Sequence, residues 1–299
     1  MCIVLYARLM DNPQLSYRQM WQSLLPLYDE GEARAMARML LEEKGGLSFT
    51  DICVGREAEL SAPLREEIAS DLQSLIKGVP LQHVLGKETF CGRTFGVSKD
   101  VLIPRPETEE LCRMIVERME TEDKHSLETV SILDIGTGSG CIAITLALDI
   151  AQARVSAWDI SAEALLTAST NAKALGAEID FSRQDALNAP DDSGKWDLIV
   201  SNPPYILNKE TEKMHANVLD HEPHTALFVP DDNPLLFYSA IASYARKALK
   251  PGGMLAFEIN PLCADDMLAM LDSEGFTSTS LLEDGFGKKR FTLSFTPNE

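Results

Sequence analysis

The sequence predicts an α/β protein with a mostly parallel sheet, an antiparallel C-terminal edge, a small all-helical N-terminal domain and a linking β-hairpin. Three observations lead to this fold class. Apolar residues at helical spacing fill residues 1–85. Strongly apolar strands then alternate with helices, which is typical of a parallel sheet covered on both faces. The chain ends in two β-prone runs around a turn, and such a pair commonly forms an antiparallel edge.

The first domain, residues 1–85, is expected to be a helical bundle. Apolar residues such as Met20, Leu24 and Leu25 recur at helical spacing, and this periodicity indicates a packed core rather than a ligand site. Glycine or proline residues follow the helices and are typical of helix ends. The predicted helices are Tyr17–Tyr28, Glu32–Lys44 and Ser61–Lys77.

Residues 86–101 are expected to form a β-hairpin that links two domains. The β-prone pieces Glu88–Phe90 and Arg93–Val97 flank Gly92, and a glycine between two such pieces indicates a tight turn. An acidic helix start follows at Glu107, where negative charge in the first turn is favoured by the helix dipole.

The second domain, residues 102–299, contains the alternating pattern. The predicted strands are Val130–Ile135, Ala153–Ile160, Ile179–Arg183, Trp196–Ser201 and Met254–Ile259. The predicted helices are Cys141–Ile150, Ala162–Leu175, Leu235–Leu249 and Cys263–Glu274. Two further strands are expected within Ser278–Phe295, around the turn Glu283-Asp284-Gly285.

Composition and charge exclude several classes of protein. Asp and Glu number 46 against 27 Lys and Arg, which gives a formal net charge of −19 and disfavours non-specific binding to nucleic-acid phosphates. No apolar run approaches the ~20 residues that span a bilayer, and the N-terminus lacks the basic residues and cleavage site of a secretory signal. The six cysteines form no C-x-x-C pair, so we expect reduced thiols in a cytoplasmic protein rather than a zinc site.

A glycine-rich loop follows the first strand of the second domain. The strand runs directly into Gly136-Thr137-Gly138-Ser139-Gly140 and then into a helix, and glycines there let backbone approach a ligand at the helix N-terminus. The third glycine of a dinucleotide fingerprint would fall on Cys141, which disfavours an NAD-dependent oxidoreductase. The G-x-G-x-G spacing instead resembles motif I of the class I, Rossmann-like methyltransferases.

That resemblance implies S-adenosylmethionine as the methyl donor and gives roles to residues at the next two strand ends. Asp159 would accept hydrogen bonds from the ribose hydroxyls, as acids at this position do in nucleotide-binding sheets. Asp185 would contact the adenine amino group, with Ala186 beside the ring. Acids at strand ends also often cap turns, so a purely structural role remains open for both aspartates.

The fourth strand of the sheet delivers Ser201-Asn202-Pro203-Pro204-Tyr205 to the edge where open α/β sheets bind ligands. An amide nitrogen is a poor nucleophile, and acceptors aimed at its N–H groups can orient it and stabilise developing positive charge. The Asn202 side-chain oxygen and the Pro203 carbonyl are the expected acceptors. Pro204 holds the backbone extended, and Tyr205 offers an aromatic face to a planar group. The tetrapeptide therefore predicts methylation of a planar amide or amine nitrogen.

The sequence resembles the peptide chain release factor glutamine N5-methyltransferase family over essentially the whole chain. The resemblance implies a protein substrate, the glutamine of the Gly-Gly-Gln loop in translation release factors, which the N-terminal helices would help to recognise. It departs from the family pattern at Glu258-Ile259-Asn260-Pro261-Leu262 and at Gly285–Arg290. Besides the glycine loop and Asn202–Tyr205, the matching segments are Gly78–Gly86, Leu102–Glu109 and Glu222–Leu227.

Two other functions compete with this interpretation. A nucleic-acid adenine N6-methyltransferase would use the same acceptors on a flipped base, but the acidic balance of the chain disfavours it. A non-catalytic binding module would be expected to lose Asn202, which is present. We expect a monomeric enzyme that acts on release factors, without direct contact to nucleic acid or membrane and without a metal.

Overall fold

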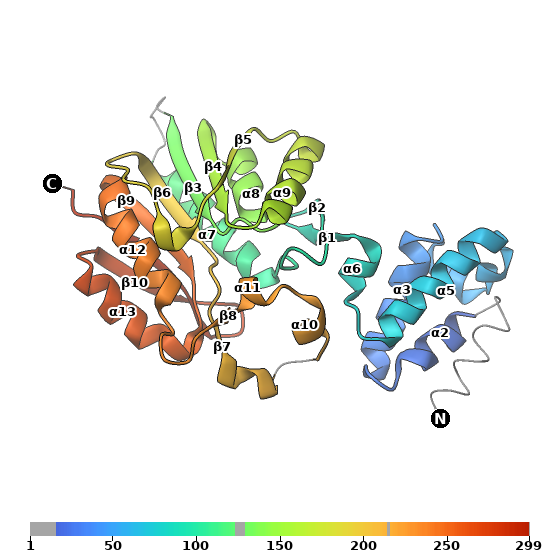
Figure 1. The fold of residues 1–299 in the computed structure, drawn as a ribbon. Coiled ribbons are helices and arrows are strands. Elements are labelled where there is room, and N and C mark those ends of the chain that lie inside the picture. Colours follow the sequence, from blue (N-terminus) through green and yellow to red (C-terminus); the bar gives the residue numbers. More distant parts are fainter. Residues whose placement is uncertain (1–15, 123–128, 214–215, 299) are drawn as a thin grey trace. The chain divides into compact units, whose positions relative to one another are not determined.

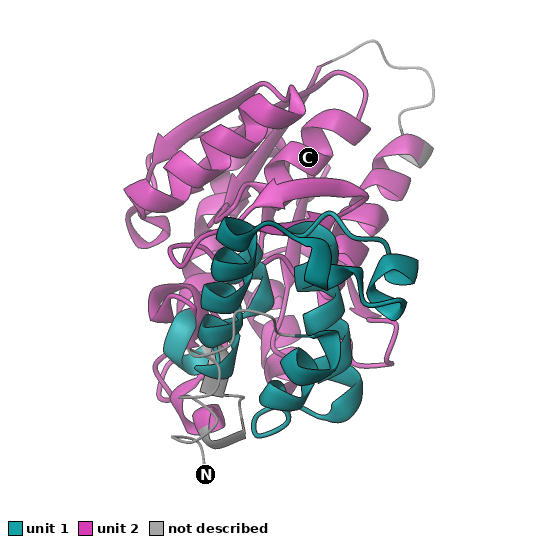
Figure 2. Cartoon of the chain, turned by 90° about the vertical axis from the view of Figure 1, so that its right-hand side faces the viewer, with its two compact units in different colours: residues 1–86, 215–221 teal, residues 87–214, 222–299 magenta. Residues whose placement is uncertain are grey.

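A computed structural model describes residues 16–122, 129–213 and 216–298 of the chain. Contacts divide the protein into two compact units, Met1–Gly86 with His215–His221 and Lys87–Met214 with Glu222–Glu299 (Figure 2). We call them unit 1 and unit 2. The N-terminal segment expected to lack a secretory signal, together with Cys2, lies outside the described residues.

Unit 1 is helical, as predicted, and its core is formed by residues such as Met20, Leu40 and Leu72. The prediction of a helix over Tyr17–Tyr28 was too long, because Pro26 has no backbone N–H to donate to the helix and its ring crowds the carbonyl four residues before it. The short helices were not predicted. The elements of unit 1 are α2 (Tyr17–Leu24), α3 (Glu30–Glu43), α4 (Phe49–Cys53), η1 (Arg56–Glu59), α5 (Ala62–Ile76), α6 (Leu81–Leu85) and α10 (Ala216–His221).

The predicted hairpin is present as β1 (Lys87–Phe90) and β2 (Arg93–Gly96). Phe90 pairs with Arg93, so Cys91 and Gly92 form a two-residue turn in which both φ angles are positive, 47° and 71°. Positive φ at both central residues is the requirement of a type I′ turn, whose twist matches that of the strands. The hairpin belongs to unit 2. There the backbone of Gly96 exchanges two hydrogen bonds with the Asn171 side chain, at 2.8 and 2.9 Å.

The centre of unit 2 is a seven-stranded sheet with the order β10-β11-β9-β6-β3-β4-β5 (Figure 1). Its strands are β3 (Val130–Ile135), β4 (Ala153–Asp159), β5 (Ile179–Arg183), β6 (Trp196–Ser201), β9 (Leu249–Glu258), β10 (Thr277–Glu283) and β11 (Lys289–Phe295). Strand β11 runs in the direction opposite to the other six strands of this sheet, so its pairings with β9 and β10 are antiparallel. The predicted fold class is therefore confirmed, with the detail that the antiparallel strand is enclosed by two others.

Helices cover both faces of this sheet. On one face α7 (Pro106–Glu122), α8 (Cys141–Asp149) and α9 (Ala162–Leu175) pack on side chains such as Ile132 and Val200. On the other, α12 (Leu236–Ala248) and α13 (Ala264–Ser273) pack on Leu133, Ile199 and Phe257. The remaining elements of unit 2 are η2 (Ala186–Asn188), β7 (Ile206–Leu207), η3 (Asn208–Lys213), α11 (His224–Leu227), β8 (Phe228–Val229) and η4 (Pro261–Cys263).

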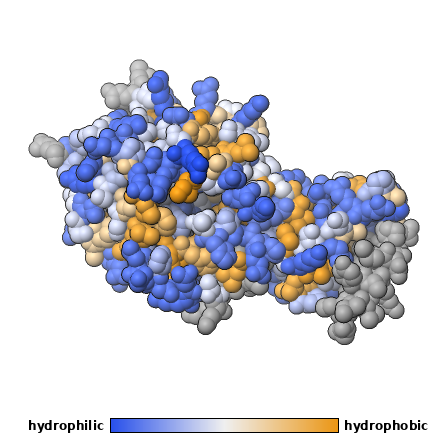
Figure 3. Space-filling view, in the orientation of Figure 1, coloured by the Kyte–Doolittle hydropathy of each residue, from blue (hydrophilic) through white to orange (hydrophobic). Residues whose placement is uncertain are grey.

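The surface of the protein mixes apolar and polar residues. Figure 3 shows apolar side chains interleaved with hydrophilic ones over the face of unit 2 that it displays. Among the described residues, no helix is both long enough and apolar enough to cross a membrane.

Candidate functional site

The glycine loop and the Asn-Pro-Pro-Tyr segment leave neighbouring strands of the sheet at the same level. Strands β3 and β6 are parallel, and Ile135 at the end of β3 pairs with Ser201 at the end of β6. The Ser201 hydroxyl donates a 2.6 Å hydrogen bond to the Ile135 carbonyl, which fixes the two exits together. The glycine loop, predicted to bind the methyl donor, and the Asn202–Tyr205 segment, predicted to bind the acceptor, therefore begin side by side.

The three glycines of the loop serve two different purposes. All have positive φ, namely 77°, 56° and 81° at Gly136, Gly138 and Gly140. A Cβ on Gly136 or Gly138 would meet no atom within 4 Å, so this part of the loop faces open space. A Cβ on Gly140 would lie 3.1 Å from the Ala168 Cβ, so here the glycine permits α8 to pack closely on α9. Ser139 is buried beside it, with its carbonyl accepting from Asn171.

A buried acid that the sequence analysis did not single out lies beneath the loop. Asp134, in β3, accepts hydrogen bonds from the Thr137 hydroxyl at 2.6 Å and from the Ala143 amide at 3.2 Å, both through Oδ2. Its other oxygen, Oδ1, is buried without a hydrogen-bond partner. Burial raises the pKa of Asp134 to about 7. An acid two residues before the first glycine, in Asp134-Ile135-Gly136, was the signal available for this residue.

Asp159 lies against the loop, at the end of β4. Its carboxylate accepts hydrogen bonds of 2.9 Å from the amides of Gly138 and Ser161. Burial raises the pKa of this carboxyl, while these hydrogen bonds act in the opposite direction. Asp159 therefore lies at the end of β4 beside the glycine loop, and its role in binding ribose hydroxyls stays a prediction.

Asp185, like Asp159, accepts a hydrogen bond from the amide two residues further along the chain. It caps the turn η2, since its two oxygens accept from the Leu187 amide at 2.9 Å and from the Asn188 side chain at 2.6 Å. Ala186 is half-buried and packs against the core on the α12 face of the sheet. The structure therefore shows the turn-capping role of Asp185 that the sequence left open.

The residues around the loop fit a positively charged methyl donor such as S-adenosylmethionine. Open space in front of Gly136 and Gly138 leaves room for a ligand against the backbone. The carboxylate of Asp159, which accepts from the Gly138 amide, supplies negative charge beside that space. Such charge favours a cation and is unfavourable on its own when buried.

Asn202 is held by a chain of hydrogen bonds that the sequence did not reveal. Its side-chain nitrogen, Nδ2, donates to the Thr108 hydroxyl at 3.2 Å. That hydroxyl donates to the carboxylate of Glu258 at 2.6 Å, and the Tyr205 hydroxyl donates to the other oxygen of the same carboxylate at 3.0 Å. Pro203 is buried and Pro204 half-buried between the two ends of this segment.

Glu258 is the centre of this network. It is 1% exposed, and burial raises its pKa, while the hydrogen bonds from Thr108 and Tyr205 and the nearby Arg290 favour the ionised form. Burial also raises the pKa of the Tyr205 hydroxyl well above its usual value, which keeps the phenol protonated. Asn260, where the sequence departs from the family pattern, donates to the Tyr205 carbonyl at 3.1 Å. Tyr205 is therefore held at its hydroxyl and at its backbone.

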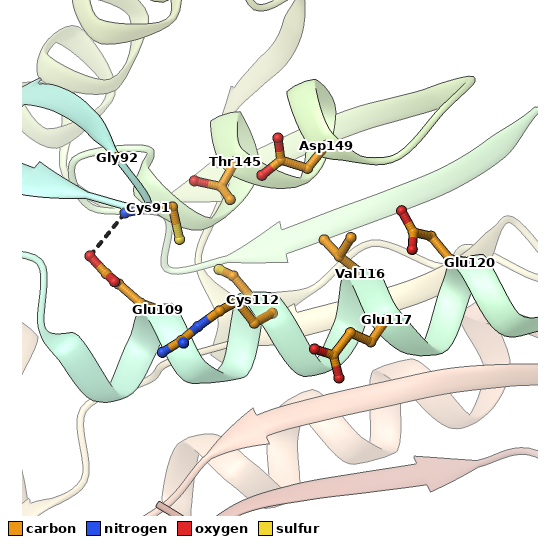
Figure 4. Close-up of a pocket in the computed structure, with 10 residues that line it drawn as sticks. Cys91, Gly92, Glu109, Cys112, Val116, Glu117, Glu120, Thr145 and Asp149 are labelled. Carbon is orange, nitrogen blue, oxygen red and sulfur yellow. Dashed lines mark hydrogen bonds between the residues drawn. The ribbon is translucent and has the colours of Figure 1, made fainter. Parts of the chain in front are cut away.

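A cavity of about 630 Å³ lies elsewhere, between the hairpin turn, α7 and α8 (Figure 4). The Cys91 amide donates to Glu109 at 2.9 Å, and the Cys91 and Cys112 thiols point toward each other. None of the site residues predicted from the sequence lines this cavity. The geometry thus separates the cavity from the edge of the sheet where the glycine loop and Asn202 meet.

Known proteins of similar sequence match nearly the whole chain. Residues 17–86 match the family model of the PrmC N-terminal domain, and residues 109–227 match that of the methyltransferase small domain. The release factor glutamine methyltransferase of Bacteroides thetaiotaomicron is 44% identical over 270 residues, 90% of this chain and 95% of that protein. Its counterpart from Flavobacterium psychrophilum is 40% identical over 276 residues, 92% and 96% of the two chains. Among solved structures, a ribosomal protein L11 methylase from Lactobacillus delbrueckii subsp. bulgaricus aligns with a TM-score of 0.46 and 22% identity, over 67% of this chain and 82% of that one.

Proposed function

The chain belongs to the release factor glutamine methyltransferase family, and from that premise we propose that it methylates the side-chain amide nitrogen, N5, of a glutamine in translation release factors. S-adenosylmethionine is the methyl donor, and the acceptor is the glutamine of the Gly-Gly-Gln loop. The adenine N6-methyltransferase alternative is not favoured, because the relatives that match most of the chain carry the release factor name.

The adjacency of the two loops is the observation that carries this proposal. A methyl transfer needs the donor methyl and the acceptor nitrogen in contact and in line. Strands β3 and β6 are direct neighbours, and the hydrogen bond from Ser201 to Ile135 keeps their ends level. A donor held by the loop that begins at Gly136 therefore lies next to an acceptor held by the segment that begins at Asn202.

The roles of the acceptor-side residues follow from their chemistry. When bound, S-adenosylmethionine supplies an electrophilic methyl group on a positively charged sulfur. The Asn202 Oδ1 and the Pro203 carbonyl oxygen accept hydrogen bonds from the two N–H groups of the substrate amide. These hydrogen bonds orient the nitrogen and stabilise its developing positive charge. Pro204 keeps these acceptors extended, and Tyr205 packs its ring against the amide plane. The proton leaves to water after transfer.

The donor-side residues hold the cofactor. In this proposal Asp159 binds the ribose hydroxyls, and Asp185 the adenine amino group, with Ala186 beside the ring. Asp185 keeps lone pairs for this contact because a carboxylate accepts about four hydrogen bonds in total and its turn uses two. The backbone that approaches the cofactor is that of Gly136, Thr137, Gly138, Ser139 and Gly140.

We also propose how the substrate is recognised and where. The helices of unit 1 match the PrmC N-terminal domain, and we assign them the task of binding the release factor outside its glutamine loop. In domain terms, residues 1–85 recognise the substrate, 86–101 link, and 102–299 carry the reaction. The protein acts as a monomer in the cytoplasm, without direct contact to nucleic acid.

The test is a methyl-transfer reaction with labelled S-adenosylmethionine and an unmodified release factor, followed by peptide mass spectrometry. One added methyl on the glutamine of the Gly-Gly-Gln peptide is the expected result. A protein that binds S-adenosylmethionine but leaves this peptide unmodified, while labelling DNA or RNA adenine, would replace this function by the nucleic-acid alternative.

A further inference from the structure

We propose that Glu258, acting through Thr108, is a positioning residue that sets which end of the Asn202 amide faces the substrate. This inference rests on the proposed function, because it concerns the acceptor that Asn202 offers to the glutamine nitrogen. All of its residues belong to unit 2: Thr108 lies in the first turn of α7, Asn202 follows β6 and Glu258 ends β9.

The Glu258 carboxylate accepts a hydrogen bond on each of its two oxygens. An ionised carboxylate has acceptors only, so any group bonded to it must donate. Glu258 receives the Thr108 hydroxyl at 2.6 Å and the Tyr205 hydroxyl at 3.0 Å, one on each oxygen. The 2.6 Å distance is that of a charge-assisted O–H···O⁻ bond, which is stronger than a bond between neutral groups.

The next step is the direction of the hydroxyl. Thr108 has one O–H proton, and Glu258 takes it, so toward Asn202 its oxygen can only accept. The end of Asn202 that it faces must therefore be the NH₂ group, as the 3.2 Å hydrogen bond from Nδ2 shows. A threonine whose proton were free could equally well donate to the amide oxygen.

The consequence falls on the other end of the amide. With Nδ2 directed to Thr108, Oδ1 lies on the opposite side of the planar group. No residue in the part of the chain that the structure describes donates a hydrogen bond to Oδ1, and Asn202 is only half-buried. The oxygen is thus left to accept from an N–H of the substrate. In the opposite orientation the NH₂ group of Asn202 would face an N–H of the substrate, and two donors that face each other repel.

A second buried threonine of unit 2 provides a matched control. Thr292 in β11 is fully buried, as Thr108 nearly is, but its hydroxyl has no hydrogen-bond partner. Replacing Thr292 by Val therefore removes a buried hydroxyl without touching the network. Thr108→Val removes a hydroxyl of the same size that joins Asn202 to Glu258.

The experiment compares wild type with Thr108→Val, Thr108→Ser, Glu258→Gln and Thr292→Val in the full chain. Single-turnover methyl transfer to a release factor gives the rate of the chemical step, and calorimetry gives the affinity for S-adenosylmethionine. Solvent exchange of the Asn202 side-chain NH₂ protons, followed by NMR and identified by their loss in Asn202→Ala, reports the hydrogen bond itself.

We expect Thr108→Val and Glu258→Gln to lower the single-turnover rate by ~10- to 100-fold, the range for losing one oriented partner, with cofactor affinity nearly unchanged. In Thr108→Val the NH₂ protons of Asn202 should exchange faster. Thr108→Ser should restore both properties, and Thr292→Val should match wild type. The positioning role of Glu258 and Thr108 is overturned if Thr108→Val transfers methyl as fast as wild type, or if Thr292→Val is as slow as Thr108→Val.

The two proposals fail separately. The wild-type protein could leave the release factor glutamine unmodified while the Asn202 NH₂ protons exchange faster in Thr108→Val. That result would keep the positioning role of Glu258 and Thr108 and remove the substrate assignment. The wild-type protein could methylate the glutamine while Thr108→Val shows the same NH₂ exchange and the same methyl-transfer rate as wild type. That result would keep the proposed function and remove the positioning role of Glu258 and Thr108.

Discussion

Arg105 forms a 2.5 Å ion pair with Glu222, whose side chain is 1% exposed, whereas that of Arg105 is 34% exposed. Glu222 also accepts a 3.3 Å hydrogen bond from the Ile103 amide. The pair joins two segments that the sequence marks as family motifs, Leu102–Glu109 and Glu222–Leu227. The Arg105–Glu222 salt bridge therefore ties these two segments together.

Removing the arginine should destabilise the protein. In Arg105→Ala the buried Glu222 carboxylate loses its counterion, and we expect the free energy of unfolding to fall by about 2–4 kcal/mol. Urea unfolding at neutral pH measures this. In Arg105→Ala with Glu222→Gln the cost should be clearly smaller than the sum of the single changes, and strictly additive costs would argue that the pair contributes nothing.

Protonation of Asp134 should make the ligand-free protein more stable in acid. Folding raises the pKa of Asp134 from 3.8 to about 7, so the folded state holds a proton that the unfolded state releases. This contribution is fully present below the unfolded pKa and is lost as the pH rises through 7. We expect Asp134→Asn, which stays neutral, to gain stability relative to wild type by up to roughly 4 kcal/mol between pH 4 and pH 8. A stability difference that stays constant over this range would contradict the raised pKa.

The glycines of the cofactor loop should respond differently to alanine. In Gly140→Ala the new Cβ would lie 3.0 Å from Ile144 Cδ1 and 3.1 Å from Ala168 Cβ, at a φ of 81°. We expect a loss of about 2–4 kcal/mol in unfolding free energy, from left-handed backbone and crowding together. Gly138→Ala shares the cost of a positive φ, 56°, but adds its Cβ in open space, so it should lose less stability than Gly140→Ala while it lowers cofactor affinity. Equal effects of the two variants on both measurements would refute this division.

Asn202→Ala should separate binding from chemistry. The variant keeps the loop that holds the cofactor, so calorimetry should show S-adenosylmethionine binding close to wild type. Methyl transfer should fall by ~10²-fold or more, because one acceptor for the substrate amide is lost. Turnover at the wild-type rate would rule out the role proposed for Asn202.

The sheet could be predicted from the sequence because its signals are local. Runs such as Val130–Ile135 and Trp196–Ser201 are apolar along their whole length, and the structure confirms both ranges as predicted. Strand β9 begins at Leu249 rather than at the predicted Met254, although Gly252 and Gly253, residues typical of turns, lie within it.

The hydrogen-bond network of the site could not be predicted, because it depends on contacts between distant parts of the chain. Thr108 and Glu258 are 150 positions apart and meet only when α7 packs beside the end of β9. The motif containing Thr108 was noticed, but nothing local distinguishes a hydroxyl that bonds a buried carboxylate from one that faces water. The departure at Asn260 has a physical account only in three dimensions, where its side chain reaches Tyr205 and Glu210.

The position of β11 has a consequence for the order of events during synthesis. It is the last strand of the sheet to be translated, yet it lies between β9 and β10. Its Arg290 is also the cation that favours ionised Glu258. A growing chain can form the glycine loop early, but β9 gains its second neighbour only when synthesis has passed Lys289–Phe295. An enzyme that modifies the machinery of termination would thus complete its own site only after the last strand of its sheet has been translated.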